Sequence, residues 1–181
     1  MDFFTFLKFL HVALAMIWLG GTLATGLLGL RVWRRGTVEG MSFIMRDTAW
    51  LAKAVFGPAT LAVLGLGVWM AWLRYDFSQA WIDLALIALA VHLGVGYGVV
   101  MPRAEVLMKA AEEGRLAESD RAPFGWVMRM GMAHEVMLFA VLLDMVTKPQ
   151  WGDTGLVGAI VVIAALGFAQ MAVPMRGPAA L

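Results

Sequence analysis

Five titratable side chains lie inside long apolar stretches of this sequence: His11, His92, His134, Glu135 and Asp144. An ionisable group in hydrocarbon is costly, so each of them marks a candidate functional position. Imidazole nitrogens bind metal ions, including the iron of haem, and they also carry protons near neutral pH. The three histidines are therefore the first candidates for chemistry.

The stretches that carry these residues are membrane spans by composition and length. Of the 181 residues, 61% are hydrophobic and 15% are charged, and the mean hydropathy is +0.79. Soluble domains are about 45–50% apolar, and about 18 consecutive apolar residues cross a bilayer. We expect an all-α polytopic membrane protein. Residues 1–150 would form a four-helix transmembrane bundle with spans at about 3–30, 49–73, 80–101 and 126–147, and residues 151–181 a fifth, accessory span at about 156–175 with a short tail.

Basic residues are distributed unevenly between the two sides of these spans. Eleven of the 14 Lys and Arg residues lie at the first connection, the third connection or the tail. The positive-inside rule then predicts a protein of the inner (cytoplasmic) membrane with its N-terminus outside and its C-terminus in the cytoplasm. The third connection, 102–125, is rich in helix formers and is predicted to extend the third span as a cytoplasmic helix. A net charge of +1 argues against nucleic-acid binding and leaves the lipid bilayer as the expected surroundings.

Depth in the bilayer separates the three histidines. At ~1.5 Å per residue, His11 lies ~12 Å below the outer boundary, His92 ~18 Å and His134 ~20 Å. The depths favour His92 with His134, although any two of the three remain candidates to share a ligand. Gly96 follows His92 by one turn, and Gly94 begins a small-xxx-small pair. We expect these glycines either to admit a flat ligand or to let two helices pack closely.

Methionine offers a second chemistry. Met130 and Met137 lie four residues before and three residues after His134, on one helical face. Thioethers and imidazole are ligands that soft Cu(I) prefers, but Met also fills apolar interiors without any further role. Glu135 is rotated by ~100° from His134. We expect its carboxyl group either to transfer protons or to be protonated and hydrogen-bonded.

Three segments resemble an uncharacterised bacterial family of integral membrane proteins. They read FLKFLHVALAMIWLGG at 6–21, GPATLAVLGLGVWMAW at 57–72 and DMVTKP at 144–149. The usual form of that family is a four-span bundle, so the fifth span lies outside the resemblance. The first segment is also similar to membrane-bound protoporphyrinogen oxidases and to membrane copper-resistance D proteins. In the oxidases a first-helix His and a third-helix Lys are the functional pair and haem b is associated with the bundle. That resemblance implies His11 and His92 as the pair here, with His92 in place of the Lys.

From these residues we expect a membrane cytochrome of b type that acts in electron transfer or haem-linked redox chemistry. Its haem b would be ligated by two of His92, His134 and His11, with Gly96 and Gly94 admitting the macrocycle. The competing classes are a copper transport or tolerance protein that uses Met and His ligands and a non-catalytic assembly subunit of a membrane complex. A membrane redox partner or a second copy of the chain are the expected partners, and the sequence leaves enzymatic activity open.

Overall fold

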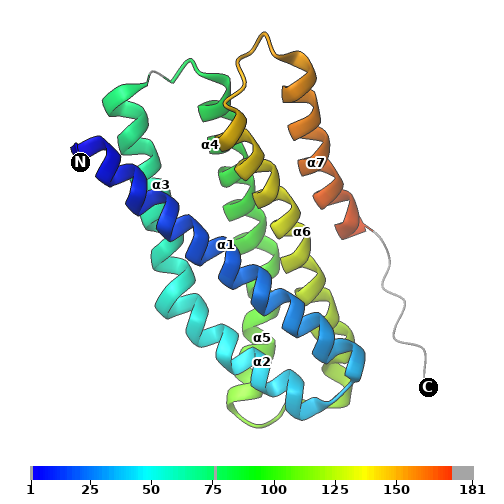
Figure 1. Cartoon of the computed structure of the whole chain (residues 1–181). Helices are drawn as coiled ribbons and strands as arrows, with labels where there is room; N and C mark the ends of the chain where they lie inside the picture. The colour runs from blue at the N-terminus through cyan, green and yellow to red at the C-terminus, as the bar shows by residue number, and fades with distance from the viewer. Residues whose placement is uncertain (1, 76, 173–181) are drawn as a thin grey trace.

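The chain folds into long helices that run side by side (Figure 1). A computed structural model describes residues 2–75 and 77–172, and these residues contain no β-strand. The elements in chain order are α1 (Phe3–Arg35), α2 (Val38–Leu51), η1 (Ala52–Phe56), α3 (Gly57–Arg74), α4 (Ala80–Val95), η2 (Gly96–Val100), α5 (Met101–Glu112), η3 (Glu118–Asp120), α6 (Arg121–Thr147) and α7 (Thr154–Ala172).

Four continuous helical stretches are long and apolar enough to cross a membrane: Phe3–Arg35, Val38–Arg74, Ala80–Glu112 and Glu118–Thr147. A shorter apolar helix, Thr154–Gln170, follows them. The prediction of an all-α polytopic membrane protein is confirmed. In Figure 1 the α3–α4 and α6–α7 connections lie at the upper end with the N-terminus, and the α1–α2 and α5–α6 connections lie at the lower end. The predicted outside position of the N-terminus stays a prediction.

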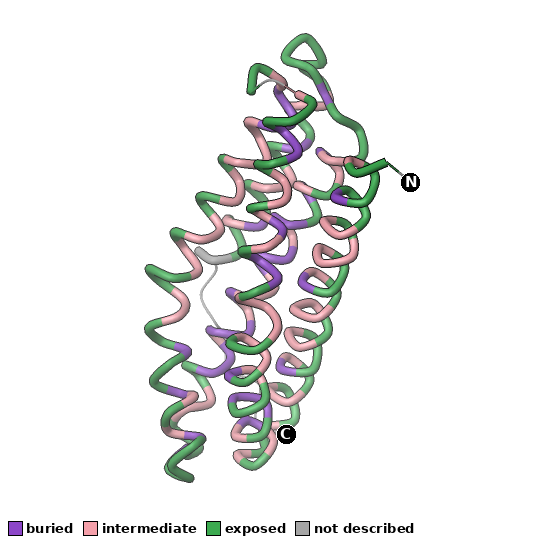
Figure 2. Tube along the Cα trace, turned by 90° about the vertical axis from the view of Figure 1, so that its left-hand side faces the viewer, coloured by how far each residue is buried: buried purple, intermediate pink, exposed green. Residues whose placement is uncertain are grey.

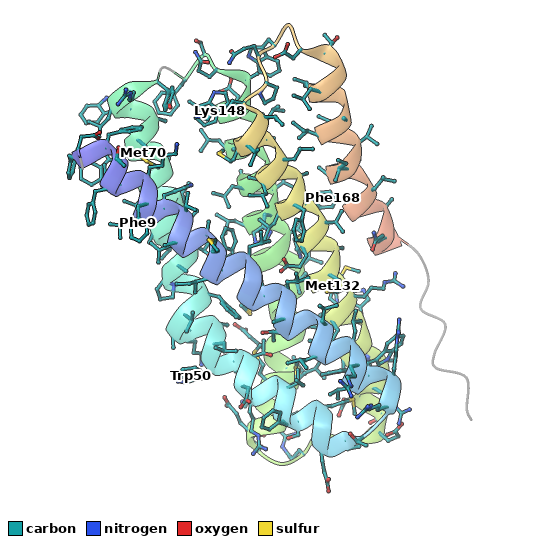
Figure 3. All side chains as sticks on the ribbon, viewed as in Figure 1. Phe9, Trp50, Met70, Met132, Lys148 and Phe168 are labelled. Carbon is teal, nitrogen blue, oxygen red and sulfur yellow. The ribbon has the colours of Figure 1, made fainter. Side chains whose placement is uncertain are left out.

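Buried residues lie on the inward sides of the helices (Figure 2), and many large apolar side chains point outward. Phe9 is 60% exposed and Trp50 is 65% exposed, and both project from the outer surface (Figure 3). An apolar outer surface of this extent would be a liability in water but is suited to contact with lipid tails.

The lower third of the bundle is more helical than the sequence suggests. We expected the second span to begin near residue 49, whereas α2 begins at Val38. The charged residues of α2 are largely exposed, and the inward face buries Met41, Ile44 and Met45 in a cluster with residues of α5 and α6. An amphipathic helix of this kind is stabilised by the partner against which it packs. On α5 the predicted helical extension of the third span is confirmed.

Two π-helical turns interrupt the long helices, and each ends just before a proline. η1 (Ala52–Phe56) precedes Pro58 and η2 (Gly96–Val100) precedes Pro102. Proline lacks an N–H group and its ring clashes with the carbonyl one turn earlier, so a local widening relieves the clash. The first turn ends at Phe56, directly before Gly57 and Pro58.

The α1–α2 connection is fixed by contact with α6. Gly36 ends α1 with a φ of 68°, a left-handed conformation that costs other residues about 1–2 kcal/mol. Its carbonyl accepts a hydrogen bond of 2.7 Å from the Arg121 guanidinium. A methyl group on Gly36 would lie 2.5 Å from both terminal nitrogens of Arg121. The backbone conformation therefore favours glycine at this position, and a larger side chain would also displace the Arg121 guanidinium.

The fifth helix packs along α6 of its own chain (Figure 1). A methyl group on Gly167 would lie only 2.8 Å from the Ala133 carbonyl oxygen, so the two backbones approach closely. Arg129 of α6 donates a hydrogen bond of 2.8 Å to the Gln170 carbonyl oxygen near the end of α7. The predicted accessory role of this helix stays a prediction, and its predicted end near Met175 lies outside the described residues.

Candidate functional site

Two of the three histidines meet inside the bundle. His92 of α4 and His134 of α6 have ring centroids 4.9 Å apart, with the ring planes inclined by 77°. On its other side His92 contacts the indole of Trp18 from α1, at a centroid distance of 5.4 Å. Three separate helices thus contribute one row of rings, Trp18, His92 and His134.

The rings lie at the upper end of a central cavity of ≈ 260 Å³ between the four long helical stretches. Both π-helical turns contribute to its wall, through Ala52 and Phe56 of η1 and through Gly96, Tyr97 and Val100 of η2. Such turns are frequent at functional sites because they re-aim side chains and free backbone groups. The cavity is therefore the best candidate for the functional site.

His11 does not belong to this cavity. It lies against α3, where its Cε1 atom would be 3.1 Å from a methyl group on Gly67 and its ring interacts with the Val63 backbone. Along α1 it precedes Trp18 by seven residues, or about 10 Å of helix. The pairing of His11 with His92 that the resemblance implied is therefore not the arrangement that this fold produces.

The polar atoms that reach the cavity are mostly hydrogen-bond acceptors. His134 interacts with the Met130 backbone carbonyl one turn earlier, and its Nε2 atom is buried without a partner. Thr22 and Thr60 donate their hydroxyl hydrogens to carbonyls of their own helices, at 2.8 and 2.7 Å, which leaves the lone pairs of the Thr60 oxygen available as acceptors. The Glu135 carboxyl group lines the same wall and interacts with the Thr22 hydroxyl. Lone pairs of this kind favour a cation over an anion.

The methionine stripe that the sequence predicted does not face the cavity. Met137 points into a separate groove beside α7, and Met130 is buried but does not line the cavity. Other thioethers take their place, because Met128 of α6 lines the wall together with three residues from the second and third helical stretches: Met45, Met101 and Met108.

The two glycines near His92 have different surroundings. Gly96 lines the cavity, and a methyl group added to it would meet no atom within 4 Å. Gly94 is exposed, does not line the cavity and has equally open surroundings. Among the described residues neither glycine serves as a tight helix contact, and only Gly96 leaves room inside the bundle.

The spacing of the imidazoles tests their fit to haem. Two imidazoles that bind one metal through bonds of about 2 Å have ring centroids about 6 Å apart when trans, and about 5 Å apart at a tetrahedral angle. The observed 4.9 Å matches the second arrangement. In addition, the cavity volume of ≈ 260 Å³ is smaller than the roughly 300–1,000 Å³ of clefts that bind drug-sized ligands. A macrocycle ligated by both His92 and His134 does not fit between the two rings at the separation that this structure shows.

A metal ion here would rely on few ligands. Within residues 2–75 and 77–172 there is no group of three or more His, Asp or Glu side chains close enough to share an ion. The imidazole pair would be the primary donors, and the thioethers that line the cavity lie more than one helical turn away from them. Two imidazoles suit a soft ion of low coordination number.

Comparison with known proteins identifies a family. A family described as "Predicted integral membrane protein (DUF2269)" matches residues 5–149, which covers the four long helical stretches and ends before α7. No curated protein and no solved structure matches the chain.

Proposed function

The chain belongs to this family of integral membrane proteins, and from that premise we propose that it binds a soft transition-metal ion, Cu(I), inside the membrane between His92 and His134. The observation that carries the proposal is the contact of the two imidazoles at 4.9 Å. Neutral imidazoles keep a lone pair for the metal, and the fixed separation matches two ligands on one ion.

The energetics of the site favour a cation. A bare ion in hydrocarbon is strongly unfavourable, so a buried cation needs donor atoms already in position. The His134 Nε2 atom and the Glu135 Oε2 atom are both buried without a hydrogen-bond partner. Such unsatisfied acceptors destabilise an empty site, and a bound cation would offset that cost.

The thioethers that line the cavity give the proposal its choice of metal. Met128 lies about 9 Å below His134 along α6, and Met101 lies about 13 Å below His92 along its helical stretch. Met45 and Met108 extend the same lining further toward the lower end. Weak, exchangeable thioether ligands along one path suit the movement of Cu(I) between the imidazoles and that end. The proposed role is therefore copper handling, by transport or tolerance.

Haem b is the second candidate, and Gly96 favours it. The wall of the cavity is open beside His92, since an added methyl group at Gly96 meets nothing within 4 Å. His134, whose ring also interacts with the Met130 carbonyl, resembles a metal ligand oriented by its second nitrogen. Haem binding would require the two imidazole rings to move apart. The proposed role of the protein would then be electron transfer through the bound haem.

The test is Cu(I) binding to the purified full chain in detergent under anaerobic, reducing conditions. Competition with the chelator bicinchoninate gives the affinity, and elemental analysis gives the stoichiometry. We expect one Cu(I) per chain. His92→Ala and His134→Ala should each weaken binding by more than about 100-fold, since loss of only an outer-shell partner already costs about 10–100-fold. His11→Ala is the matched control and should bind as the wild type does.

A reduced-minus-oxidised visible spectrum of the same protein, purified from haem-replete cells, separates the two candidates. A colourless protein with tight Cu(I) binding supports copper. A stoichiometric haem spectrum that disappears in His134→Ala would show that the site binds haem b rather than copper. Equal Cu(I) affinity in the wild type, His92→Ala and His134→Ala would refute the assignment of the site.

A further inference from the structure

A second unusual group lies on the other side of α6. Asp144 sits about one turn below the upper end of the helix, and only 1% of its surface is exposed. Both of its carboxylate oxygens are buried and have no hydrogen-bond partner among the residues that the structure describes. A buried carboxylate without a donor is costly, and the central cavity does not use it.

Asp144 lines a groove of ≈ 270 Å³ between α4, α6 and α7. Every other described residue that lines this groove is apolar, including Val91 of α4, Met137 of α6 and Phe168 of α7, and Phe168 is labelled in Figure 3. From Asp144 to Met137 the groove follows about 10 Å of α6 away from the upper end. Its shape is an apolar channel with one acceptor group at its top.

The nearest cation on the same helix is engaged elsewhere. Lys148 follows Asp144 by one turn, but its ammonium group lies over two rings, 5.4 Å from the centroid of Tyr75 and 5.1 Å from that of Trp81. It is labelled at the upper end of α6 in Figure 3. The ion pairs found in the described part of the chain join Arg115 with Glu113 and Arg121 with Glu118. No internal cation therefore compensates the Asp144 carboxylate among the described residues.

We propose that this groove binds an ammonium group that carries an alkyl chain. The N–H groups of the ammonium donate to Asp144 Oδ1 and Oδ2, and the chain lies along the apolar wall toward Met137. A charge-assisted hydrogen bond satisfies both orphaned oxygens, and burial of the chain supplies the rest of the affinity. Because Asp144 lies near a helix end, this ammonium group can belong to a free alkylamine or to the headgroup of phosphatidylethanolamine. In the lipid, the phosphate would lie above Asp144 at the bilayer surface, and an acyl chain, rather than a chain on the nitrogen, would fill the apolar groove.

The fifth helix completes the site. Four of its apolar residues and Phe168 form one wall of the groove, and the close contact of Gly167 with the Ala133 carbonyl holds that wall in place. The family match ends at residue 149, before α7 begins. This groove thus depends on a helix outside the matched segment, and the proposal does not rest on copper binding in the central cavity.

The test uses octylamine as the probe and 1-octanol as its uncharged match. The purified, delipidated full chain is unfolded by heat in maltoside detergent, with tryptophan fluorescence as the readout. At an octylamine concentration ten times its Kd, we expect the midpoint temperature of thermal unfolding of the wild type to rise by about 3–6 °C. Octanol should raise it by much less. Asp144→Asn keeps the side-chain volume and should lose the difference between the two probes.

Two further variants keep the result interpretable if Asp144→Asn folds poorly. Ala164→Phe fills the groove without touching the carboxylate and should also lose the octylamine response. Lys148→Met removes the neighbouring cation and should retain the response. If octylamine and octanol stabilise the wild type equally, or if Asp144→Asn responds as the wild type does, the proposal is wrong.

Lipid exchange identifies the source of the ammonium group. The protein is placed in nanodiscs that contain phosphatidylethanolamine and analysed by native mass spectrometry. If the lipid occupies the groove, each wild-type chain should retain one phosphatidylethanolamine, and Asp144→Asn should retain none. Octylamine should then compete with the lipid. A free amine as occupant predicts no retained lipid and an octylamine response that phosphatidylethanolamine does not change. Retention that is equal in the wild type and in Asp144→Asn would exclude the lipid headgroup as the ligand.

Discussion

The α1–α2 connection allows a quantitative test of how the lower end of the bundle is held together. Gly36 and Gly114 both have positive φ values, 68° and 66°. An alanine at either position meets the same backbone penalty of about 1–2 kcal/mol. Only at Gly36 would the new methyl group meet neighbours, the Arg121 guanidinium nitrogens at 2.5 Å, whereas at Gly114 it meets nothing within 4 Å.

The difference between the two substitutions therefore measures the Arg121 contact. Displacing the guanidinium breaks its hydrogen bond of 2.7 Å to the Gly36 carbonyl, and hydrogen bonds to charged groups contribute about 1.5–3 kcal/mol. The Arg121 side chain is 28% exposed, so water replaces part of this loss. We expect Gly114→Ala to cost about 1–2 kcal/mol and Gly36→Ala about 2–4 kcal/mol.

The assay is reversible unfolding in mixed micelles with increasing sodium dodecyl sulfate, followed by tryptophan fluorescence. A double-mutant cycle with Arg121→Gln isolates the contact, because in that background Gly36→Ala should approach the cost of Gly114→Ala. Equal costs for the two glycine substitutions in the wild-type background would show that Arg121 does not fix this connection.

Three further predictions concern orientation, copper and α7. In intact cells a membrane-impermeant thiol reagent should label Gly152→Cys but not Glu113→Cys, because the chain has no other Cys and the positive-inside rule places position 113 in the cytoplasm; the reverse pattern would invert the topology. Met128→Leu should slow the release of Cu(I) from the imidazole pair to an external chelator several-fold without changing the equilibrium affinity, and Met137→Leu should change neither, since only Met128 lines the central cavity; equal release rates would contradict a thioether path. Gly167→Val should make the α6–α7 connection more sensitive to protease, because a methyl group at Gly167 already meets the Ala133 carbonyl at 2.8 Å; unchanged cleavage would mean that α7 is held by other contacts.

The spans could be predicted from the sequence because hydropathy and length decide which segments enter a membrane. α2 could not. The polar residues between 38 and 51 suggest a connection, and the apolar face that buries Met41 and Met45 is recognisable only when α5 and α6 lie beside it. Local composition therefore underestimates helices that are stabilised by packing rather than by the bilayer.

For the candidate site, the sequence predicts the depth of each residue along its helix but not the side of the helix that faces the cavity. Depth along each span follows from the helical rise, and this arithmetic favoured His92 with His134, whose rings the structure brings into contact. Rotation of each helix about its own axis depends on packing between helices. For that reason the sequence could not tell that Met128, rather than Met130 or Met137, lines the cavity.

α6 connects the two proposed sites because helices cover it on two sides. One face, with Gly131, His134 and Glu135, lines the central cavity, and another, with Met137 and Asp144, lines the groove beneath α7. His134 and Asp144 are ten residues apart, which separates them by about 15 Å along the helix and turns them by about 80°. Titratable groups tolerate burial only where protein or a ligand, rather than lipid, surrounds them. The fifth helix accordingly encloses Asp144, much as the four-helix bundle encloses the imidazole pair.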